Sequence, residues 1–431
     1  MGRSLLAEPS VAEVHRQLAS LHARGARKVM LMGGEALLRR DLPALLRHAR
    51  TLGLGPLGVA TNGCALAPEG TLERLIDAGL ELVELSIHGH TPELANAIAG
   101  TRFTFERQAR TLAQLQRLGE LRVTVNTVIC RSNVAVLAEV ARYVLSVCPR
   151  ADAFKLKLAA ARGRALAPRD ESAELLGYDE VALEPVAALL TAAGKPFWFE
   201  GFPLCRLGAH AHRSHELHLL ARDERYFDFD HDGQYPEARD GYFDSGRQLQ
   251  SRRWPAPSCS PCPLRPICGG VDLGLVHELG LPELATAERA PEPLLAQALA
   301  SHGLDPALAR TRLAQLRGEA RPAEIDHSAP LLPSLRFEHP AEPEPVELWI
   351  ERIRPGAPAY ARSARFALSY RATSGGGPST RPALRELLAH ASELLRAADE
   401  RGASLAAARQ AVGRLRRGGW SGPTPAQEPS A

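Results

Sequence analysis

The chain has 431 residues and a formal net charge of +3, and 45% of its residues are hydrophobic. At roughly 150 residues per domain, this length predicts two or three domains with sizeable cores. Charges of both signs are interspersed, no apolar run is long enough to span a membrane, and no signal peptide opens the sequence, so we expect a cytoplasmic protein that binds neither nucleic acid nor membrane.

The first part of the chain alternates helices with short apolar strands. Ser10 begins an amphipathic helix, and Gly25 ends it. Five strands are predicted, at residues 28–32, 57–61, 82–87, 121–129 and 154–158. The helices between them are predicted at 41–52, 69–78, 103–118 and 134–147. Such alternation with short loops predicts an α/β fold with a parallel sheet.

The remainder of the chain is less regular. We expect a helix at 181–193, a strand at 197–200 and a turn-rich stretch that carries four cysteines. Two strands of a hairpin are predicted at 347–354 and 364–371, and a helical segment at 381–417. We therefore divide the chain into a core (1–165), a cysteine-bearing region (166–282), a helical segment (283–320), a Pro-rich linker (321–346), a C-terminal α+β unit (347–417) and a disordered tail (418–431).

Two polar stretches in the middle of the chain have competing interpretations. "HAHRSHELH", residues 210–218, is interpreted as an exposed polar helix, with a metal site as the alternative. "RYFDFDHDGQY", residues 225–235, is interpreted as a strand and a hairpin turn, with the lining of a substrate channel as the alternative.

Ligands of parallel α/β folds bind at the carboxyl ends of the strands, so the residues there are candidate site residues. These are Gly33, Gly34 and Glu35, then Thr61 and Asn62, then Ser86, then Asn126. Adjacent glycines free the backbone for close approach to a ligand. The Glu35 carboxylate can accept hydrogen bonds from a ligand ammonium, a contact of ~1.5–3 kcal/mol. The alternative is a tight turn with a solvated glutamate.

Four strings together resemble radical S-adenosylmethionine (radical SAM) enzymes: "MGGEALLRRDL", "VATNG", "LVELSIHGHTPELANAIAGT" and "VTVNTVICRSN". The resemblance covers roughly residues 9–165 and implies a partial (β/α)6 TIM-like barrel, here without its first strand. It implies that Gly33, Gly34 and Glu35 hold the methionine amino group of S-adenosylmethionine. By the same resemblance Ser86 and Asn126 contact its ribose or carboxylate, and Thr61 and Asn62 end the third strand of the family's barrel.

Four later cysteines carry a second resemblance. Cys205 is followed by Cys259, Cys262 and Cys268 in "CSPCPLRPICGG". Four thiolates at this spacing can hold zinc or an iron–sulfur cluster. The spacing resembles the start of the SPASM or twitch auxiliary-cluster domains of radical SAM enzymes and implies one [4Fe-4S] auxiliary cluster, with zinc as the alternative. Unrelated buried thiols are the remaining possibility.

The C-x3-C-x2-C loop that binds the radical-generating [4Fe-4S] cluster in this family does not occur in the sequence. Cys64, Cys130 and Cys148 do not replace it, because Cys148 ends a helix at the opposite face of the sheet from the other two. We expect either an N-terminal truncation, which we favour, or a genuine cluster-less relative. As printed, the chain is expected to be inactive in reductive cleavage.

The resemblance implies radical modification of a peptide or small-molecule substrate by hydrogen abstraction, with an electron donor such as a flavodoxin or ferredoxin. The alternative from another functional class is a non-catalytic binding or accessory protein with a structural zinc or a single iron–sulfur site. No catalytic residue is assigned.

Overall fold

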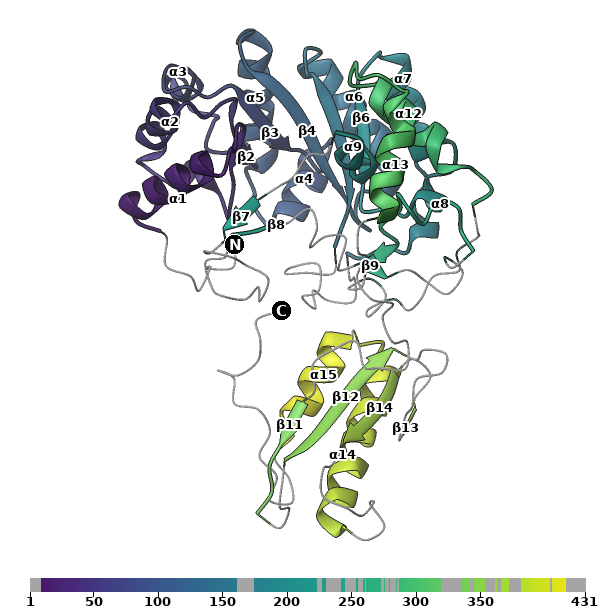
Figure 1. Cartoon of the computed structure of the whole chain (residues 1–431). Helices are drawn as coiled ribbons and strands as arrows, with labels where there is room; N and C mark the ends of the chain where they lie inside the picture. The colour runs from purple at the N-terminus through teal and green to yellow at the C-terminus, as the bar shows by residue number, and fades with distance from the viewer. Residues whose placement is uncertain are drawn as a thin grey trace.

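The computed structural model describes residues 9–160, 174–222, 227–229, 242–244, 253–254, 259, 261–272, 275, 279, 284, 287–318, 335–340, 345–352, 361–362, 366–371, 381–403 and 405–415. Most of them belong to two units, each with its own buried hydrophobic cluster. Figure 1 shows the larger, mixed α/β unit in purple to green and the C-terminal unit in yellow-green. Within the described residues, no helix is both long and apolar enough to cross a membrane.

The larger unit is built on a parallel sheet of six strands that follow one another in chain order. The strands are β1 (Val29–Leu31), β2 (Leu57–Thr61), β3 (Leu82–Ser86), β4 (Arg122–Ile129), β5 (Ala153–Leu158) and β6 (Phe197–Glu200). Each strand pairs in parallel with the next, and no pairing joins β6 back to β1 among the described residues. The fold is thus mixed α/β with a six-stranded parallel sheet, consistent with a partial TIM-like barrel, and barrel closure is not seen.

One helix precedes β1, and the others return the chain from the end of each strand to the start of the next. They are α1 (Val11–Ala23), α2 (Leu42–Thr51), α3 (Thr71–Asp77), α4 (Pro92–Ala99), α5 (Thr104–Arg117), α6 (Leu137–Val147) and α7 (Glu184–Ala192). Ser10 caps α1 as predicted, because its hydroxyl accepts a hydrogen bond from the Glu13 N–H at 3.2 Å. The period-2 alternation of the strands buries one face under these helices, as with Val83 and Leu85 on β3.

Residue Phe197 and its neighbours in β6 belong to the same parallel sheet as the first five strands. β6 pairs with β5, and Phe154 lies opposite Phe197. The sheet therefore continues past residue 165, where the sequence analysis placed the end of the core. Phe197 and Phe199 are fully buried, which explains why this short strand stays in the sheet.

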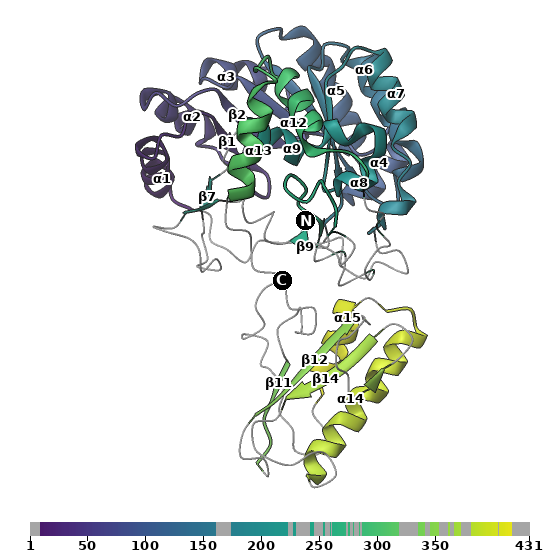
Figure 2. The ribbon, with the colours of Figure 1, turned by 45° about the vertical axis from the view of Figure 1, so that its right-hand side comes forward.

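A helical group follows β6 and lies against its end. It consists of α8 (Leu204–Leu207), α9 (His215–Arg222), α12 (Pro291–Ala300) and α13 (Leu308–Gly318). Figure 2 shows α9, α12 and α13 side by side in front of the sheet, and contacts link α9 to α12 and α12 to α13. The prediction of an exposed helix at the histidine-rich stretch was wrong: His218 is only 3% exposed, because the apolar face of α9 packs into the core.

Strand and helix predictions for the C-terminal unit are confirmed and extended. β12 (Val346–Arg352) pairs antiparallel with β14 (Phe366–Arg371), as the predicted hairpin requires. Two more strands, β11 (Leu335–Phe337) and β13 (Ala361–Arg362), lie at the edges, and α14 (Pro382–Glu400) and α15 (Leu405–Gly413) supply the helices. The assignment of residues 321–346 as linker was therefore wrong at its end, since β11 contributes buried Leu335 and Phe337.

Among the other predicted segments, β7 (Phe227–Phe229) confirms a strand in the aromatic–acidic stretch and pairs antiparallel with β8 (Tyr242–Asp244). The predicted turn through residues 232–233 and the tail from residue 418 lie outside the described residues.

Candidate functional site

The loop after β1 leaves the backbone of Gly33 and Gly34 accessible. Both glycines are exposed, and a Cβ atom placed on either would meet nothing within 4 Å. Gly33 has φ +151°, which L side chains rarely adopt, so glycine suits this position. The peptide groups of the two glycines are therefore open to direct contact with a ligand.

The Glu35 carboxylate joins this loop to the end of β2. Its Oε1 accepts a hydrogen bond from the Thr61 hydroxyl at 2.9 Å and from the Leu37 N–H at 3.3 Å. Its Oε2 accepts one from the Asn62 N–H at 3.0 Å. A carboxylate has about four acceptor positions, so these donors leave one at Oε2 for a ligand ammonium. The ligand contact of Glu35 stays a prediction, and this connection between two loops was not predicted from the sequence.

A buried polar row on α5 supports the loop after β2. The Gln108 side chain donates to the Asn62 carbonyl at 3.0 Å and to the Ser86 carbonyl at 2.9 Å. The Thr111 hydroxyl donates to the Gly63 carbonyl at 2.8 Å. Gln114, one further turn along, donates to the Ala67 carbonyl at 2.8 Å. Through these hydrogen bonds, the three side chains hold the loop after β2 and the end of β3 in place.

The sequence analysis missed this row, although a signal was present. Gln108, Thr111 and Gln114 are spaced three residues apart, on the face of α5 that also carries the buried Leu112 and Leu115. Polar residues on the apolar face of an amphipathic helix must find partners in the interior. That spacing could have indicated a helix that donates hydrogen bonds to the loops beside it.

Ser86 and Asn126 lie opposite each other on β3 and β4, as their positions at neighbouring strand ends predict. The Asn126 amide oxygen is buried and has no hydrogen-bond partner within the described part of the chain. An unsatisfied buried acceptor of this kind costs about 1–3 kcal/mol. A ligand donor placed over β3 and β4 would remove that cost, so this position suits a bound polar ligand.

Four charged side chains cross the same face of the sheet. The Lys155 ammonium lies 2.8 Å from Glu84 Oε1 and 3.6 Å from Glu200 Oε2, while Lys157 lies 2.7 Å from Glu200 Oε1. Burial opposes the charge on Lys155, but Glu200 and Glu84 outweigh it and raise the pKa of this lysine. Burial would likewise raise the pKa of Glu200, yet Lys157 and Lys155 hold it at about 2. The inner face is therefore polar and charge-balanced.

The four distal cysteines are all free thiols. The backbone N–H groups of Leu204 and Gly270 both point at Cys268 Sγ, with N···S distances of 3.4 and 3.5 Å. Burial, and then the nearby Cys268, Cys259 and Cys262, raise the pKa of the Cys205 thiol to about 11. The other three sulfurs thus lie near enough to Cys205 to influence its thiol electrostatically.

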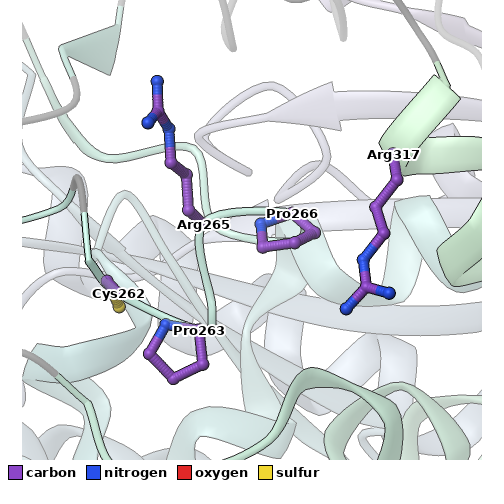
Figure 3. A pocket seen from close by; sticks show the side chains of 5 residues that line it. All are labelled: Cys262, Pro263, Arg265, Pro266 and Arg317. Atoms are coloured by element: carbon purple, nitrogen blue, oxygen red, sulfur yellow. The ribbon is translucent and has the colours of Figure 1, made fainter.

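The donor chemistry of this cysteine set suits a metal, although its geometry is not that of a formed site. Four thiols and two N–H···S contacts are the groups that hold zinc or an iron–sulfur cluster and tune it. In the described ranges, no group of three or more His, Cys, Asp or Glu side chains is arranged to hold a metal ion. Figure 3 shows Cys262 at one side of a pocket of about 400 Å³, with Arg317 of α13 at the other.

The other three thiols do not form a donor set for a radical-generating cluster. Burial raises the pKa of Cys130 to about 12, with the Glu174 carboxylate adding to the effect, and Cys148 is fully buried. Cys130 follows β4 whereas Cys148 follows α6, so they lie at opposite ends of the sheet. These residues do not fit such a cluster.

The fold and the strand-end residues define an α/β protein whose ligand site lies over a parallel sheet. Residues 2–143 match the family model of the Radical SAM superfamily, so this part of the chain is similar to that superfamily. It is similar to a PqqA peptide cyclase of Xanthomonas oryzae pv. oryzae, with 41% identity over 109 residues. It is also similar to a probable GTP 3′,8-cyclase of Metallosphaera sedula, with 33% identity over 109 residues.

These similarities cover limited parts of the chains. Each covers 25% of this chain, and they span 28% of the PqqA peptide cyclase and 33% of the probable GTP 3′,8-cyclase. They support the similarity to the superfamily only for the parts of the chains that they cover.

Proposed function

We propose that the protein binds S-adenosylmethionine over the carboxyl ends of β1 to β4 and takes part in radical modification of a peptide. The observation that carries the proposal is the buried, unsatisfied Asn126 amide oxygen, at a strand end of a radical SAM superfamily domain. Beside a reduced iron–sulfur cluster, S-adenosylmethionine would supply a 5′-deoxyadenosyl radical. Because Cys64, Cys130 and Cys148 do not fit that cluster, the role proposed for the chain's own residues is to bind and orient S-adenosylmethionine.

The chain's own residues would bind and orient the cofactor. The exposed peptide groups of Gly33 and Gly34 admit its amino-acid end, and the remaining acceptor position on Glu35 Oε2 takes its ammonium. Asn126 then accepts a hydrogen bond from the ribose or the amino-acid end, with Ser86 beside it. Thr61 and Asn62 act indirectly, by holding the Glu35 carboxylate in place.

The names of the relatives favour a peptide over a small molecule. The PqqA peptide cyclase is 41% identical over the matched stretch, and the probable GTP 3′,8-cyclase is 33% identical. We therefore propose a peptide substrate, and a low-potential donor such as a flavodoxin or ferredoxin as the source of electrons.

Cys205, Cys259, Cys262 and Cys268 are proposed to hold one auxiliary [4Fe-4S] cluster. Support comes from the electrostatic influence of the other three thiols on Cys205 and from the two N–H groups directed at Cys268 Sγ. Zinc at the same cysteines is the competing occupant, because thiolate sets of this kind hold either metal.

Calorimetric titration with S-adenosylmethionine tests the cofactor proposal. Asn126→Leu should weaken binding about tenfold, because it removes one buried hydrogen bond worth about 1.4 kcal/mol. Thr124→Val is the matched control, since Thr124 lies on the same strand and face but two residues further from the strand end. The proposal fails if wild-type protein shows no binding up to about 1 mM, or if the two variants behave alike.

Metal analysis after anaerobic reconstitution with iron and sulfide tests the cysteine proposal. Wild-type protein should take up iron and sulfide in equal amounts, and Cys262→Ala should lose both. Cys64→Ser, at a half-buried thiol outside the set, should keep them. Bound zinc without iron would instead favour the structural-metal alternative.

A further inference from the structure

The two lysines of β5 stand out against the composition of the chain. Only four of its 52 basic residues are lysines, Lys28, Lys155, Lys157 and Lys195, and two of these lie on the inner face of the sheet. Arginine and lysine are not interchangeable, because an ammonium is a compact charge with three donors whereas a guanidinium is a planar fork. The inner face of the sheet therefore carries two compact ammonium charges in a chain whose other basic residues are mostly arginines.

The contacts of the two ammonium groups differ. Lys155 lies between two carboxylates and its side chain is 15% exposed, so it serves as an internal tie between β3, β5 and β6. Lys157, one residue before the end of β5, contacts a single carboxylate oxygen of Glu200, and its side chain is 39% exposed. An ammonium has three N–H donors, so within the described residues Lys157 keeps two for another acceptor.

Lys157 also lies beside the proposed cofactor site. Its register partner on β4 is Val128, two residues beyond Asn126, and all three residues belong to the partly exposed inner face. A molecule held over the ends of β1 to β4 can therefore reach Lys157 on the next strand, β5. Lys155 holds the Glu200 carboxylate in place, and Glu200 in turn orients the Lys157 side chain.

We propose that Lys157 is a specificity-determining residue that binds a side-chain carboxylate of the peptide substrate. This inference rests on the proposed peptide-modifying function. Before the substrate binds, the two carboxylates on this face, Glu84 and Glu200, balance the charges of the two lysines. Lys157 therefore acts through short charge-assisted hydrogen bonds rather than through excess positive charge. Because an ammonium and a carboxylate pair most strongly when partly shielded from water, the inner face favours this contact over one at the surface.

The small number of lysines allows a direct test on the unmodified sequence. Protein labelled with [ε-¹³C]lysine should give four Cε resonances, one for each lysine, and Lys157→Arg assigns the relevant signal by its loss. The probes are N-acetyl-aspartate N-methylamide, whose only charge is its side-chain carboxylate, and the neutral N-acetyl-asparagine N-methylamide. Neither probe needs an iron–sulfur cluster or the cofactor to bind.

The acidic probe should shift the Lys157 resonance saturably and at about tenfold lower concentration than the neutral probe. Lys28 and Lys195, which lie outside the inner face, serve as internal references for non-specific ion pairing. Equal responses to the two probes, or a Lys157 shift no larger than those of Lys28 and Lys195, would overturn the assignment. Because S-adenosylmethionine binding is measured separately, a failure here is distinguishable from a failure of the proposed function.

Discussion

Replacing Glu35 by glutamine should open the junction between the loops after β1 and β2. A glutamine side chain has one acceptor oxygen, whereas the Glu35 carboxylate accepts hydrogen bonds from three donors. That oxygen can accept from the Thr61 hydroxyl and the Leu37 N–H together, or from the Asn62 N–H, but not from all three. In the better orientation the amide NH₂ faces the Asn62 N–H, so that donor is left unpaired. The expected loss is about 1–3 kcal/mol of local stability.

Hydrogen exchange followed by mass spectrometry measures this loss where it occurs. In Glu35→Gln, amide exchange in peptides that cover Asn62 should accelerate about ten- to a hundredfold, because local opening becomes easier by that free energy. The matched control is Glu69→Gln, an exposed carboxylate beyond the same loop, which should leave the exchange unchanged. Affinity for S-adenosylmethionine should fall in Glu35→Gln as well. The reasoning is refuted if Asn62 exchanges at the wild-type rate in the glutamine variant.

Three further changes test other parts of the structure by urea-induced unfolding. Burial lowers the pKa of His218 from an ordinary value near 6.5 to about 3, so protonation of this histidine favours the unfolded chain. The free energy of unfolding should therefore be highest above pH 6.5 and about 2 kcal/mol lower at pH 5. His218→Gln should lack this dependence of stability on pH. Gln108→Met should lower the free energy of unfolding by about 2–4 kcal/mol, because the carbonyls of Asn62 and Ser86 lose their hydrogen-bond donor. A decrease below about 1 kcal/mol would mean that water replaces the Gln108 side chain as donor. Gly63→Ala should cost about 1–3 kcal/mol, since Gly63 has φ +80° and a Cβ would lie 2.5 Å from Leu85 Cδ1; unchanged stability would contradict the tight packing.

The sequence located most of the elements because their patterns are local. Alternation of apolar and polar residues predicted β3 and β4, and apolar residues at helical spacing predicted α5 and α6. It missed α4, whose residues were read only as part of a motif, and it assigned the position of β11 to a linker. Both are short, and their stability depends on packing against neighbouring elements rather than on their own sequence.

The strand-end positions of the candidate residues were predicted from the sequence, but their contacts were not. Because Ser86 and Asn126 both lie near the carboxyl ends of predicted strands, we expected them to be close together. Their pairing in register on β3 and β4 confirms that they are neighbours. The partners of Glu35 were not predictable, since Thr61 follows it by 26 residues and only the parallel pairing of β1 with β2 brings the two together.

What the sequence determined by itself was the class of fold, the superfamily motifs and the residue types at the strand ends, because hydrophobic period and turn chemistry act over a few residues. What only the tertiary structure decided was which polar groups meet: the hydrogen bonds from α5 to the strand ends, the burial of His218, and the charge network of Lys157, Glu200 and Lys155. Hydrogen bonds and ion pairs depend on distances of a few tenths of an ångström between segments far apart in the chain, and sequence spacing does not set those distances.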